Sequence, residues 1–408
     1  MTGSGARPPV ALYVHIPFCV SVCPYCDFVV YAGAAARGPR NRVARLLGAL
    51  RAEIGLRADA LDERFGLDRP PLASVYIGGG TPSLVHPDEI ASLLDLVRVR
   101  FGLADDAEVT LEANPGPDER GDAGALSRAG VGRLSIGAQS LDAAELKRLG
   151  RRHRPSDVAD AVAAGREAGI RSINVDLLYD VPGGSLAAWM ATLDAALGMG
   201  PDHLSIYALT LDDPDAEGLT QAGGDHLPTS AGARRWREAA RPEQDEDRAA
   251  AQYHHAVVRL GGDGWRGYEI SNWARPGHES RHNLAYWQRQ PYEAVGPGAH
   301  AFDGETRRWN AARLDGYVAA LVPGGARPAQ PPPGGSEAID QAAAASEAAI
   351  LGLRLDAGLP LVASTEPPLD AWFGWALAAD LVEVSEADRI VLTTRGRLLS
   401  NELFSRLV

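Results

Sequence analysis

Six short apolar runs recur along the first half of the chain, and each is followed by a longer amphipathic stretch. The runs are rich in Val, Ile, Leu and Tyr, and they cover residues 12–16, 74–77, 108–111, 133–136, 172–177 and 203–207. Short apolar runs are typical of buried strands, whereas apolar residues that return every three or four positions indicate helices. Repeated strand–helix units predict parallel strands joined by right-handed crossovers. We therefore expect an α/β fold in the form of a barrel or partial barrel.

The pattern changes in the second half of the chain. We divide the chain into a core over 1–250, a connecting segment over 251–321, a Pro/Gly-rich linker over 322–336 and a C-terminal module over 337–408. Residues 212–250, at the end of the core, are polar and are expected to form a crossover loop. The module's spacing predicts a helix over 338–355, two strands around an acidic turn over 381–392 and a final amphipathic helix over 396–407. This order resembles a winged-helix module.

The acidic composition narrows the possible function classes. The 408 residues carry a formal net charge of −13, and 45% of them are hydrophobic. This charge argues against a protein that grips nucleic-acid phosphates, because such contacts need a basic face. No run of about 18 apolar residues occurs, and the N-terminus lacks the apolar segment of a signal peptide. We expect a cytoplasmic protein whose contact with membranes is at most peripheral.

The three cysteines of the chain lie within one stretch of eight residues. Their spacing is C-x3-C-x2-C, at Cys19, Cys23 and Cys26. An odd, clustered set does not resemble a disulfide framework, and thiols gathered in this way usually bind metal or do redox chemistry. Three thiolates can hold three irons of a [4Fe–4S] cluster, whose fourth iron is then open to an outside ligand. Zinc is the alternative, but a structural zinc site needs four protein ligands, and His15 is the only further candidate nearby.

Residues of chemical interest follow the ends of the predicted strands. Cys19 follows the first strand, and a glycine-rich turn that ends in Thr81 follows the second. In barrel-type α/β folds the carboxyl ends of the strands form the active face, so we expect these residues to gather there. Glycines let the backbone approach a ligand closely, and carboxylates bind hydroxyl or ammonium groups.

Taken together, these motifs resemble those of the radical S-adenosylmethionine (SAM) proteins and, more narrowly, the oxygen-independent coproporphyrinogen III oxidase superfamily. The matching text runs in order through nearly the whole chain: LYVHIPFCVSVCPYCDF, YIGGGTPS, LEANP, IGAQS, LGRRH, INVDLLYDVPG, YALTL, YEISN, RHNLAYW and LTTRGRLLSN. The resemblance implies a partial (β/α)6 radical-SAM barrel with a smaller C-terminal helical, winged-helix-like domain. It also implies a [4Fe–4S] cluster on the three cysteines, with SAM on the open iron.

The resemblance assigns contacts with SAM residue by residue. The implied set is Tyr13, Gly79, Gly80, Thr81, Glu112, Gln139, Arg151, Asp176 and Ala208. Arg152 adjoins Arg151, and a shift of one residue would exchange them. The alternative for Tyr13 is packing within its strand, and the alternative for a single acidic residue is the capping of the next helix.

Two branches of this superfamily differ in their motifs. The oxidases carry a further cysteine two residues after the third, where this chain has Phe28, and an N-terminal extension for which the short segment before Cys19 leaves no room. The segment RHNLAYW matches the His-Asn-x-x-Tyr-Trp pattern of the haem chaperone branch. The resemblance therefore favours a chaperone that binds haem and transfers it to an acceptor protein. The alternative is the oxidase, a radical SAM decarboxylase of coproporphyrinogen III.

His282 of the segment RHNLAYW is the candidate haem ligand. If the segment is helical, His282 and Tyr286 lie one turn apart on one face, and imidazole is a natural axial ligand of haem iron. The same cluster could instead dock two domains, and His300, His254 and His255 are further candidates.

The resemblance also implies partners. These are haem, an acceptor such as a respiratory haem protein, and an electron donor such as flavodoxin, ferredoxin or an NADH-dependent system, with no nucleic acid. No catalytic residue is assigned, and whether the chain is an enzyme stays open. The remaining alternatives are a radical-SAM modifier of nucleic acid, which the acidic charge disfavours, and a structural zinc module.

Overall fold

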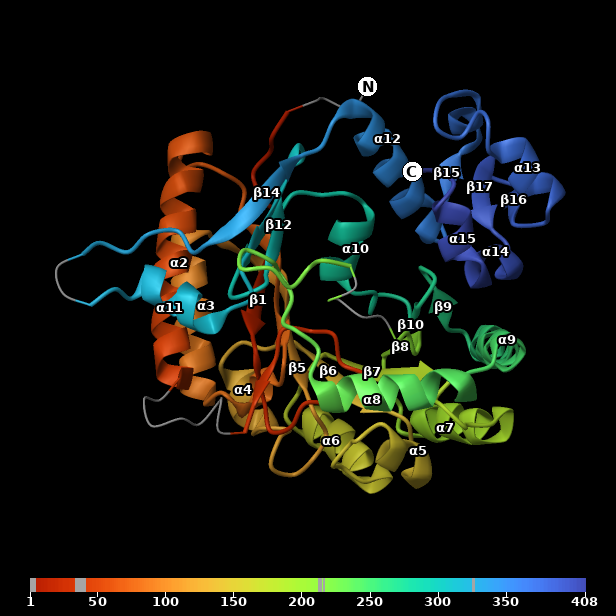
Figure 1. The fold of residues 1–408 in the computed structure, drawn as a ribbon, viewed down its shortest axis with the longest axis horizontal. Coiled ribbons are helices and arrows are strands. Elements are labelled where there is room, and N and C mark those ends of the chain that lie inside the picture. Colours follow the sequence, from red (N-terminus) through yellow and green to blue (C-terminus); the bar gives the residue numbers. More distant parts are fainter. Residues whose placement is uncertain (1–4, 34–41, 212–214, 216, 325–326) are drawn as a thin grey trace.

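The computed structural model describes residues 5–33, 42–211, 215, 217–324 and 327–408. Its centre is a sheet that contains all six predicted strands (Figure 1). These are β1 (Ala11–Ile16), β4 (Leu72–Gly79), β5 (Leu103–Ala113), β6 (Arg133–Gln139), β7 (Ser172–Tyr179) and β8 (His203–Ala208). Each pairs in parallel with the next, as predicted, so their carboxyl ends lie on one face.

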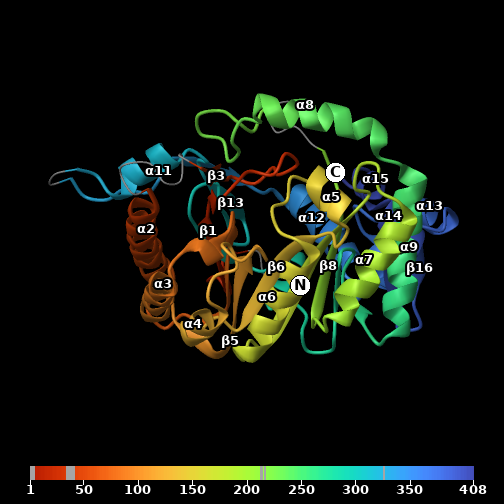
Figure 2. The same ribbon diagram turned by 90° about the horizontal axis from the view of Figure 1, so that it is seen from below.

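Helices connect these strands and cover the outer side of the curved sheet (Figure 2). They are α2 (Arg42–Phe65), α3 (Pro87–Arg100), α4 (Ala123–Arg128), α5 (Ala143–Arg148), α6 (Pro155–Glu167) and α7 (Leu186–Gly198). The main core lies between the two layers, where Leu50 and Ile54 of α2 join Val75 and Ile77 of β4. Burial of such side chains stabilises the fold by about 1.5–3 kcal/mol each. The strand–helix alternation is that of a partial barrel.

Two helices follow β8, and one of them is a correction. Residues 231–240, expected within a polar loop, form α8 (Ala231–Ala240). Its sequence, AGARRWREAA, is polar on average, and only Arg237 and Ala240 are buried, so its low apolar content made it resemble a loop. The next helix, α9 (Glu246–Gly262), contains the predicted helical segment AQYHHAVVRLGG.

The sheet extends beyond the six predicted strands on both sides. On one side β11 (Tyr292–Val295) pairs in parallel with β1, and β12 (His300–Phe302), β13 (Thr306–Asn310) and β14 (Gly334–Ala338) follow antiparallel. On the other side β8 is followed by β10 (Asn272–Ala274) and β9 (Arg266–Gly267). Residues 251–321, predicted as a connecting segment, thus contribute β9 to β13 to the main sheet, and the last residues of the linker predicted over 322–336 lie in β14. The five residues of β14 are GGSEA, which carry no apolar signal, and their pairing with β13 alone makes them a strand.

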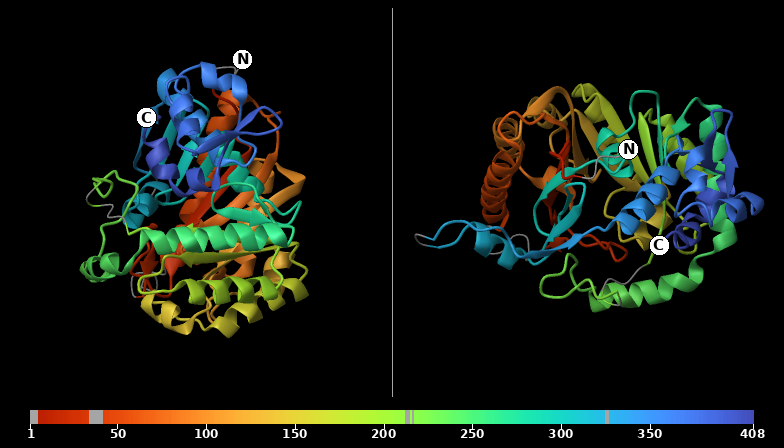
Figure 3. Two further views of the ribbon diagram at one scale, coloured as in Figure 1. Left: turned by 90° about the vertical axis from the view of Figure 1, so that its right-hand side faces the viewer. Right: turned by 90° about the horizontal axis from the view of Figure 1, so that it is seen from above.

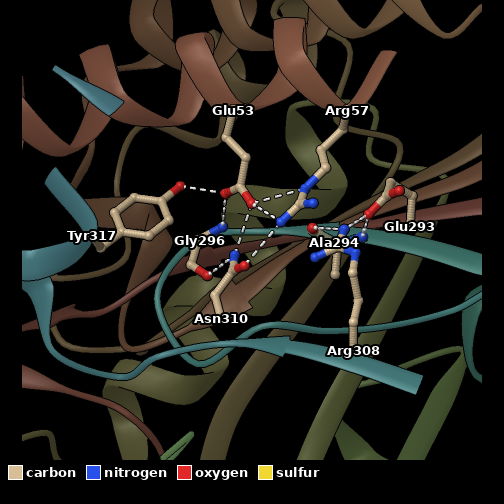
Figure 4. A network of polar contacts seen from close by, with 8 residues as sticks. All are labelled: Glu53, Arg57, Glu293, Ala294, Gly296, Arg308, Asn310 and Tyr317. Atoms are coloured by element: carbon tan, nitrogen blue, oxygen red, sulfur yellow. Dashed lines mark hydrogen bonds and ion pairs between the residues drawn. The ribbon is translucent and has the colours of Figure 1, made fainter. Parts of the chain in front are cut away.

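A buried carboxylate joins α2 to the added strands (Figure 4). Glu53 of α2 is fully buried and accepts hydrogen bonds from the Gly296 amide at 2.9 Å and the Tyr317 hydroxyl at 2.6 Å. It also accepts from Asn310 Nδ2 at 2.9 Å and pairs with Arg57 at 3.0 Å. Tyr317 lies on α11 (Leu314–Leu321). This network fixes the turn between β11 and β12 against α2.

The C-terminal module has its own small core. It consists of α12 (Gln341–Arg354), β15 (Leu359–Pro360), α13 (Phe373–Ala378), β16 (Val382–Val384), β17 (Arg389–Leu392), α14 (Thr394–Leu398) and α15 (Ser400–Phe404). Leu353, Trp372 and Leu403 pack together there, and Ile270 joins them from the main part of the chain. The final helix predicted over 396–407 is two helices, because Leu399 leaves helical geometry (φ −97°, ψ 19°). Figure 3 shows this module, in blue, beside the green segment of α9.

Among the described residues, no helix is both long and apolar enough to cross a membrane.

Candidate functional site

The cysteine loop is closed at its base by two short parallel strands. β2 (Phe18–Cys19) pairs with β3 (Tyr31–Ala32), so the chain returns to the point where the loop begins. Within the loop, the Cys26 amide donates a hydrogen bond to the Cys23 carbonyl at 3.1 Å. The loop also packs on the glycine-rich turn after β4, where a Cβ on Gly80 would lie 2.7 Å from the Phe18 carbonyl oxygen. Glycine is therefore required at this position.

Two side chains from outside the loop reach the cysteine sulfurs. The Thr81 hydroxyl donates a hydrogen bond to Cys19 Sγ at 3.5 Å, and Arg151 Nη1 donates to Cys23 Sγ at 3.6 Å. Burial raises the pKa of the Cys19 thiol to about 11, although the hydroxyl of Thr81 lowers it in part. Binding of a cation at the thiols would have to displace their protons.

Arg151, and not the exposed Arg152, contacts the cysteine loop. Its Nη2 donates to Asn114 Oδ1 and to the Gly137 carbonyl, both at 2.6 Å. Its buried Nε has no hydrogen-bond partner among the described residues. A buried unpaired guanidinium nitrogen beside the cysteine loop fits an anionic ligand group, such as the carboxylate of an amino acid.

The surroundings of the cysteine loop bear on the choice between zinc and an iron–sulfur cluster. In the described parts of the chain, no group of three or more His, Cys, Asp or Glu side chains is placed to hold a single metal ion. A zinc ion needs all its ligands around one centre, whereas an iron–sulfur cluster takes its thiolates on separate irons. His15, the additional zinc ligand considered, engages both ring nitrogens, with the Tyr13 hydroxyl at 2.9 Å and the Val29 carbonyl at 2.8 Å. The loop therefore suits a cluster better than zinc.

A buried carboxylate lies at the end of β5, directly behind the glycine-rich turn. Glu112 accepts hydrogen bonds from the Gly79 amide at 2.8 Å and from the Tyr76 hydroxyl at 2.9 Å. Burial raises the pKa of Glu112 to about 7, and the nearby Asp176 adds to the rise. Gly79 has a φ of +115°, and a Cβ there would meet the His15 ring at 2.5 Å. The close packing of this turn thus requires its glycines, and the Gly80 amide is also bonded, to the Ile16 carbonyl at 2.9 Å.

The other predicted SAM residues lie at the neighbouring strand ends. Asp176 on β7 accepts from Asn174 Nδ2 at 2.7 Å and from the Ser135 hydroxyl at 3.2 Å, and burial raises its pKa. Gln139, at the end of β6, has a φ of +68°, a strained conformation that is frequent at functional sites. Ala208 is exposed at the end of β8.

Tyr13 extends this set toward β11. Its ring stacks on Tyr76 with the centroids 6.2 Å apart, and Tyr76 in turn bonds to Glu112. The strand-end rule thus accounts for much of the predicted SAM set, whereas Arg151 comes from the loop between α5 and α6. Their carboxylates and unpaired arginine nitrogen fit a ligand with ribose hydroxyls, an ammonium group and a carboxylate.

His282 lies outside this set, in a buried network of its own. It is on α10 (Arg281–Trp287) and is 1% exposed. Its Nδ1 bonds with Ser74 Oγ at 3.0 Å, and its Nε2 bonds with the Tyr286 hydroxyl at 2.8 Å. Burial lowers the pKa of His282 to about 3. The helical pairing of His282 with Tyr286 is confirmed, but coordination of iron would require one hydrogen bond to break, and this role stays a prediction.

A cavity of about 550 Å³ opens between the cysteine loop and the strands added on the β1 side of the sheet. Phe28 borders it from the loop, Tyr286 from α10 and Phe302 from β12. His226 and His300 also line it. The volume falls within the range of about 300–1,000 Å³ that is usual for small-molecule sites.

Asp225 and His226 are cavity residues that the sequence analysis missed. They lie in the polar stretch expected to be a loop, and Asp225 bonds to His300, which is 75 positions later in the chain. The adjacent Asp-His pair was the only local signal, and it is weak without the spatial partner. Of the other candidates, His254 is exposed on α9, and neither it nor His255 lines the cavity.

The chain is similar in sequence to radical SAM proteins and to haem chaperones. Residues 13–196 match the Radical SAM superfamily. The chain is 38% identical over 400 residues to the haem chaperone HemW of Mycobacterium tuberculosis, covering 98% of this chain and 95% of that protein. It is 31% identical to the haem chaperone HemW of Bacillus subtilis, covering 96% and 97%.

A solved structure shows the same fold. The coproporphyrinogen III oxidase HemN of Escherichia coli, a radical SAM enzyme, superimposes with a TM-score of 0.76 over 99% of this chain and 91% of that chain. The sequence identity is 23%, so this likeness concerns the fold alone. It extends over the C-terminal module as well as the barrel.

Proposed function

This chain belongs to the HemW family of radical SAM proteins, and on that premise we propose that it is a haem chaperone, which binds haem and transfers it to an acceptor protein. The observation that carries the proposal is identity of 38% to a haem chaperone over 98% of the chain, which includes both the barrel and the C-terminal module. The proposal agrees with Phe28 standing where the oxidases of the superfamily have a further cysteine.

The resident cofactors of the proposal are a [4Fe–4S] cluster and SAM. Cys19, Cys23 and Cys26 would hold the cluster, and Arg151 beside Cys23 would balance its negative charge. When bound, such a cluster supplies an open iron that chelates SAM and an electron that can cleave it.

The chain's own groups would position SAM. Gly79 and Gly80 let the turn pass close to the cysteine loop, while Glu112 and Asp176 would offer acceptors for the hydroxyl and ammonium groups of SAM. The ring of Tyr13 would separate this site from the cavity, whose lining it shares. Tyr13 thus links a SAM site to the space in which cargo can sit.

The proposal includes partners that follow from this role. The acceptor would be a haem protein, such as one of a respiratory chain, and the electron donor a flavodoxin, a ferredoxin or an NADH-dependent system. The protein would act in the cytoplasm and would reach membrane-bound acceptors by peripheral contact.

Anaerobic reconstitution followed by haem titration tests the proposal. The full chain should bind haem stoichiometrically and pass it to an apo-haem protein, and it should leave coproporphyrinogen III unchanged. Conversion of that substrate to protoporphyrinogen in the presence of SAM and a reductant would assign the oxidase function instead. Absence of haem binding would refute the chaperone function.

A further inference from the structure

The cavity beside the cysteine loop has the wall of a site for a flat aromatic ligand. Tyr286 and Trp287 border it from α10, and Tyr292 and Phe302 from β11 and β12. The rings of Tyr286 and Tyr292 meet edge to face with centroids 4.5 Å apart, so this wall is packed and fixed. The indole Nε1 of Trp287 is buried and has no hydrogen-bond partner among the described residues.

Two imidazoles are fixed on the same cavity by one carboxylate. Asp225 Oδ1 bonds with His226 Nδ1 at 3.0 Å, and Asp225 Oδ2 bonds with His300 Nε2 at 2.7 Å. The indole of Trp309 stacks on the His300 ring at 5.9 Å between centroids. A carboxylate behind an imidazole fixes its orientation and increases its basicity as a metal ligand.

The hydrogen bonds of the histidines show which ring nitrogens remain available. His15 and His282 each engage both nitrogens. Within the described residues, His226 keeps Nε2 and His300 keeps Nδ1 without a hydrogen bond, and their side chains are 29% and 36% exposed. These two imidazoles can bind a metal in the cavity without losing an existing contact.

A cationic end of the cavity complements the imidazoles. Arg289 and Arg307 both pair with Glu347 of α12, at 3.1 Å and 2.6 Å. Two guanidinium groups share this carboxylate, although Arg307 also pairs with Glu337. Arg289 Nη2 is buried with no hydrogen-bond partner in the described parts of the chain. Such an end suits a carboxylate on the ligand, because guanidinium–carboxylate pairs are strong and directional.

We propose that this cavity is the haem site, that the imidazoles on Asp225 supply the iron ligand, and that Arg289 receives a propionate. The inference rests on the proposed haem chaperone function and names its ligands. It places the cargo next to the cysteine loop, since Asp27, Phe28 and Val29 line the same cavity.

The test compares haem binding by the reconstituted full chain with that of a double variant, His226→Ala with His300→Ala. A matched control is His86→Ala with His254→Ala, which removes two exposed histidines outside the cavity. Because an iron–sulfur cluster absorbs near the haem Soret band, bound haem is quantified as the pyridine haemochrome and its ligation is read by resonance Raman spectroscopy. We expect the cavity variant to bind haem at least about ten-fold more weakly and to lose the iron–imidazole stretch, whereas the control keeps both. Added imidazole should restore the stretch in His226→Gly with His300→Gly.

Two further variants keep the inference testable if the double variant is unstable. Asp225→Asn retains both imidazoles but removes their negative partner, so the iron–imidazole stretch should shift to lower frequency. His282→Leu should retain the stretch. If wild type binds haem and the cavity variants show its affinity and spectrum, the inference is overturned while the chaperone function stands. If wild type binds no haem, the proposed function itself fails.

Discussion

Replacement of Glu53 by leucine tests how the cavity wall is held in place. Glu53 is fully buried, and it accepts hydrogen bonds from the Gly296 amide, the Asn310 amide and the Tyr317 hydroxyl, in addition to its ion pair with Arg57. Leucine has similar bulk but accepts none of these bonds. The variant therefore isolates the polar network of Figure 4 from the packing around it.

The magnitude follows from what the variant leaves behind. Each buried donor that loses its acceptor costs about 1–3 kcal/mol, and removal of one partner of a buried ion pair typically costs about 3–5 kcal/mol. Arg57 is 17% exposed and keeps a hydrogen bond to Asn310 Oδ1 at 3.1 Å, which reduces its loss. We expect Glu53→Leu to lower the free energy of unfolding by about 3–5 kcal/mol in total.

Urea unfolding with matched controls measures this loss. Tyr317→Phe removes a single donor from the network and should cost about 1 kcal/mol. Glu89→Gln breaks the pair between α3 and Arg51 of α2, whose side chains are 44% and 34% exposed, and should cost less than about 1 kcal/mol. Hydrogen exchange should also increase at Gly296, and haem affinity should fall because the same turn leads to His300. A loss below about 1 kcal/mol for Glu53→Leu would refute the network's role.

Three further predictions concern the candidate cluster and SAM site. Gly80→Ala should lower the iron and sulfide content of reconstituted protein several-fold, because the new Cβ would lie 2.7 Å from the Phe18 carbonyl oxygen. The control is Gly198→Ala, whose Cβ would have nothing within 4 Å. Equal iron and sulfide content in the two variants would contradict this account. Burial raises the pKa of Glu112 from 4.5 to about 7, so the folded state binds the extra proton and stability falls as pH rises between these values. The free energy of unfolding should fall by at most about 3 kcal/mol. Urea unfolding at about pH 5 and about pH 8 should show this fall in wild type and not in Glu112→Gln. If the two proteins lose the same stability between these pH values, the raised pKa does not belong to Glu112. Arg151→Met should weaken SAM binding at least about ten-fold in anaerobic calorimetry, whereas Arg152→Met should bind like wild type; equal loss in both would refute the selection of Arg151.

The sequence predicts the parallel half of the sheet well because its strands are buried on both faces. The strand Ser172–Tyr179 reads SINVDLLY, and five of its eight residues are buried, on both faces of the sheet. The added strands give no such signal. Thr306–Asn310 reads TRRWN, with four of five positions only partly buried, and its conformation is imposed by pairing with β12 and β14. Tertiary pairing, and not local preference, makes these segments strands.

Some residues of the candidate site could likewise be predicted from the sequence, and others could not. Glu112 and Asp176 could be predicted, because the end of a parallel strand fixes where its last residues point. The group formed by Asp225, His226 and His300 could not, because it joins a polar loop to a strand 75 positions away. The likeness of motifs pointed to His282, whereas the hydrogen bonds around it are visible only in three dimensions.

The most direct test of the whole account is the iron and acid-labile sulfide content of anaerobically reconstituted protein. Wild type should hold about four of each per chain, with the absorbance and electron paramagnetic resonance signals of a [4Fe–4S] cluster that change when SAM is added. The variant Cys19→Ala with Cys23→Ala and Cys26→Ala should hold none while keeping its circular dichroism spectrum. Equal iron and sulfide in the two proteins, or a wild type that takes up zinc and no sulfide, would contradict the account.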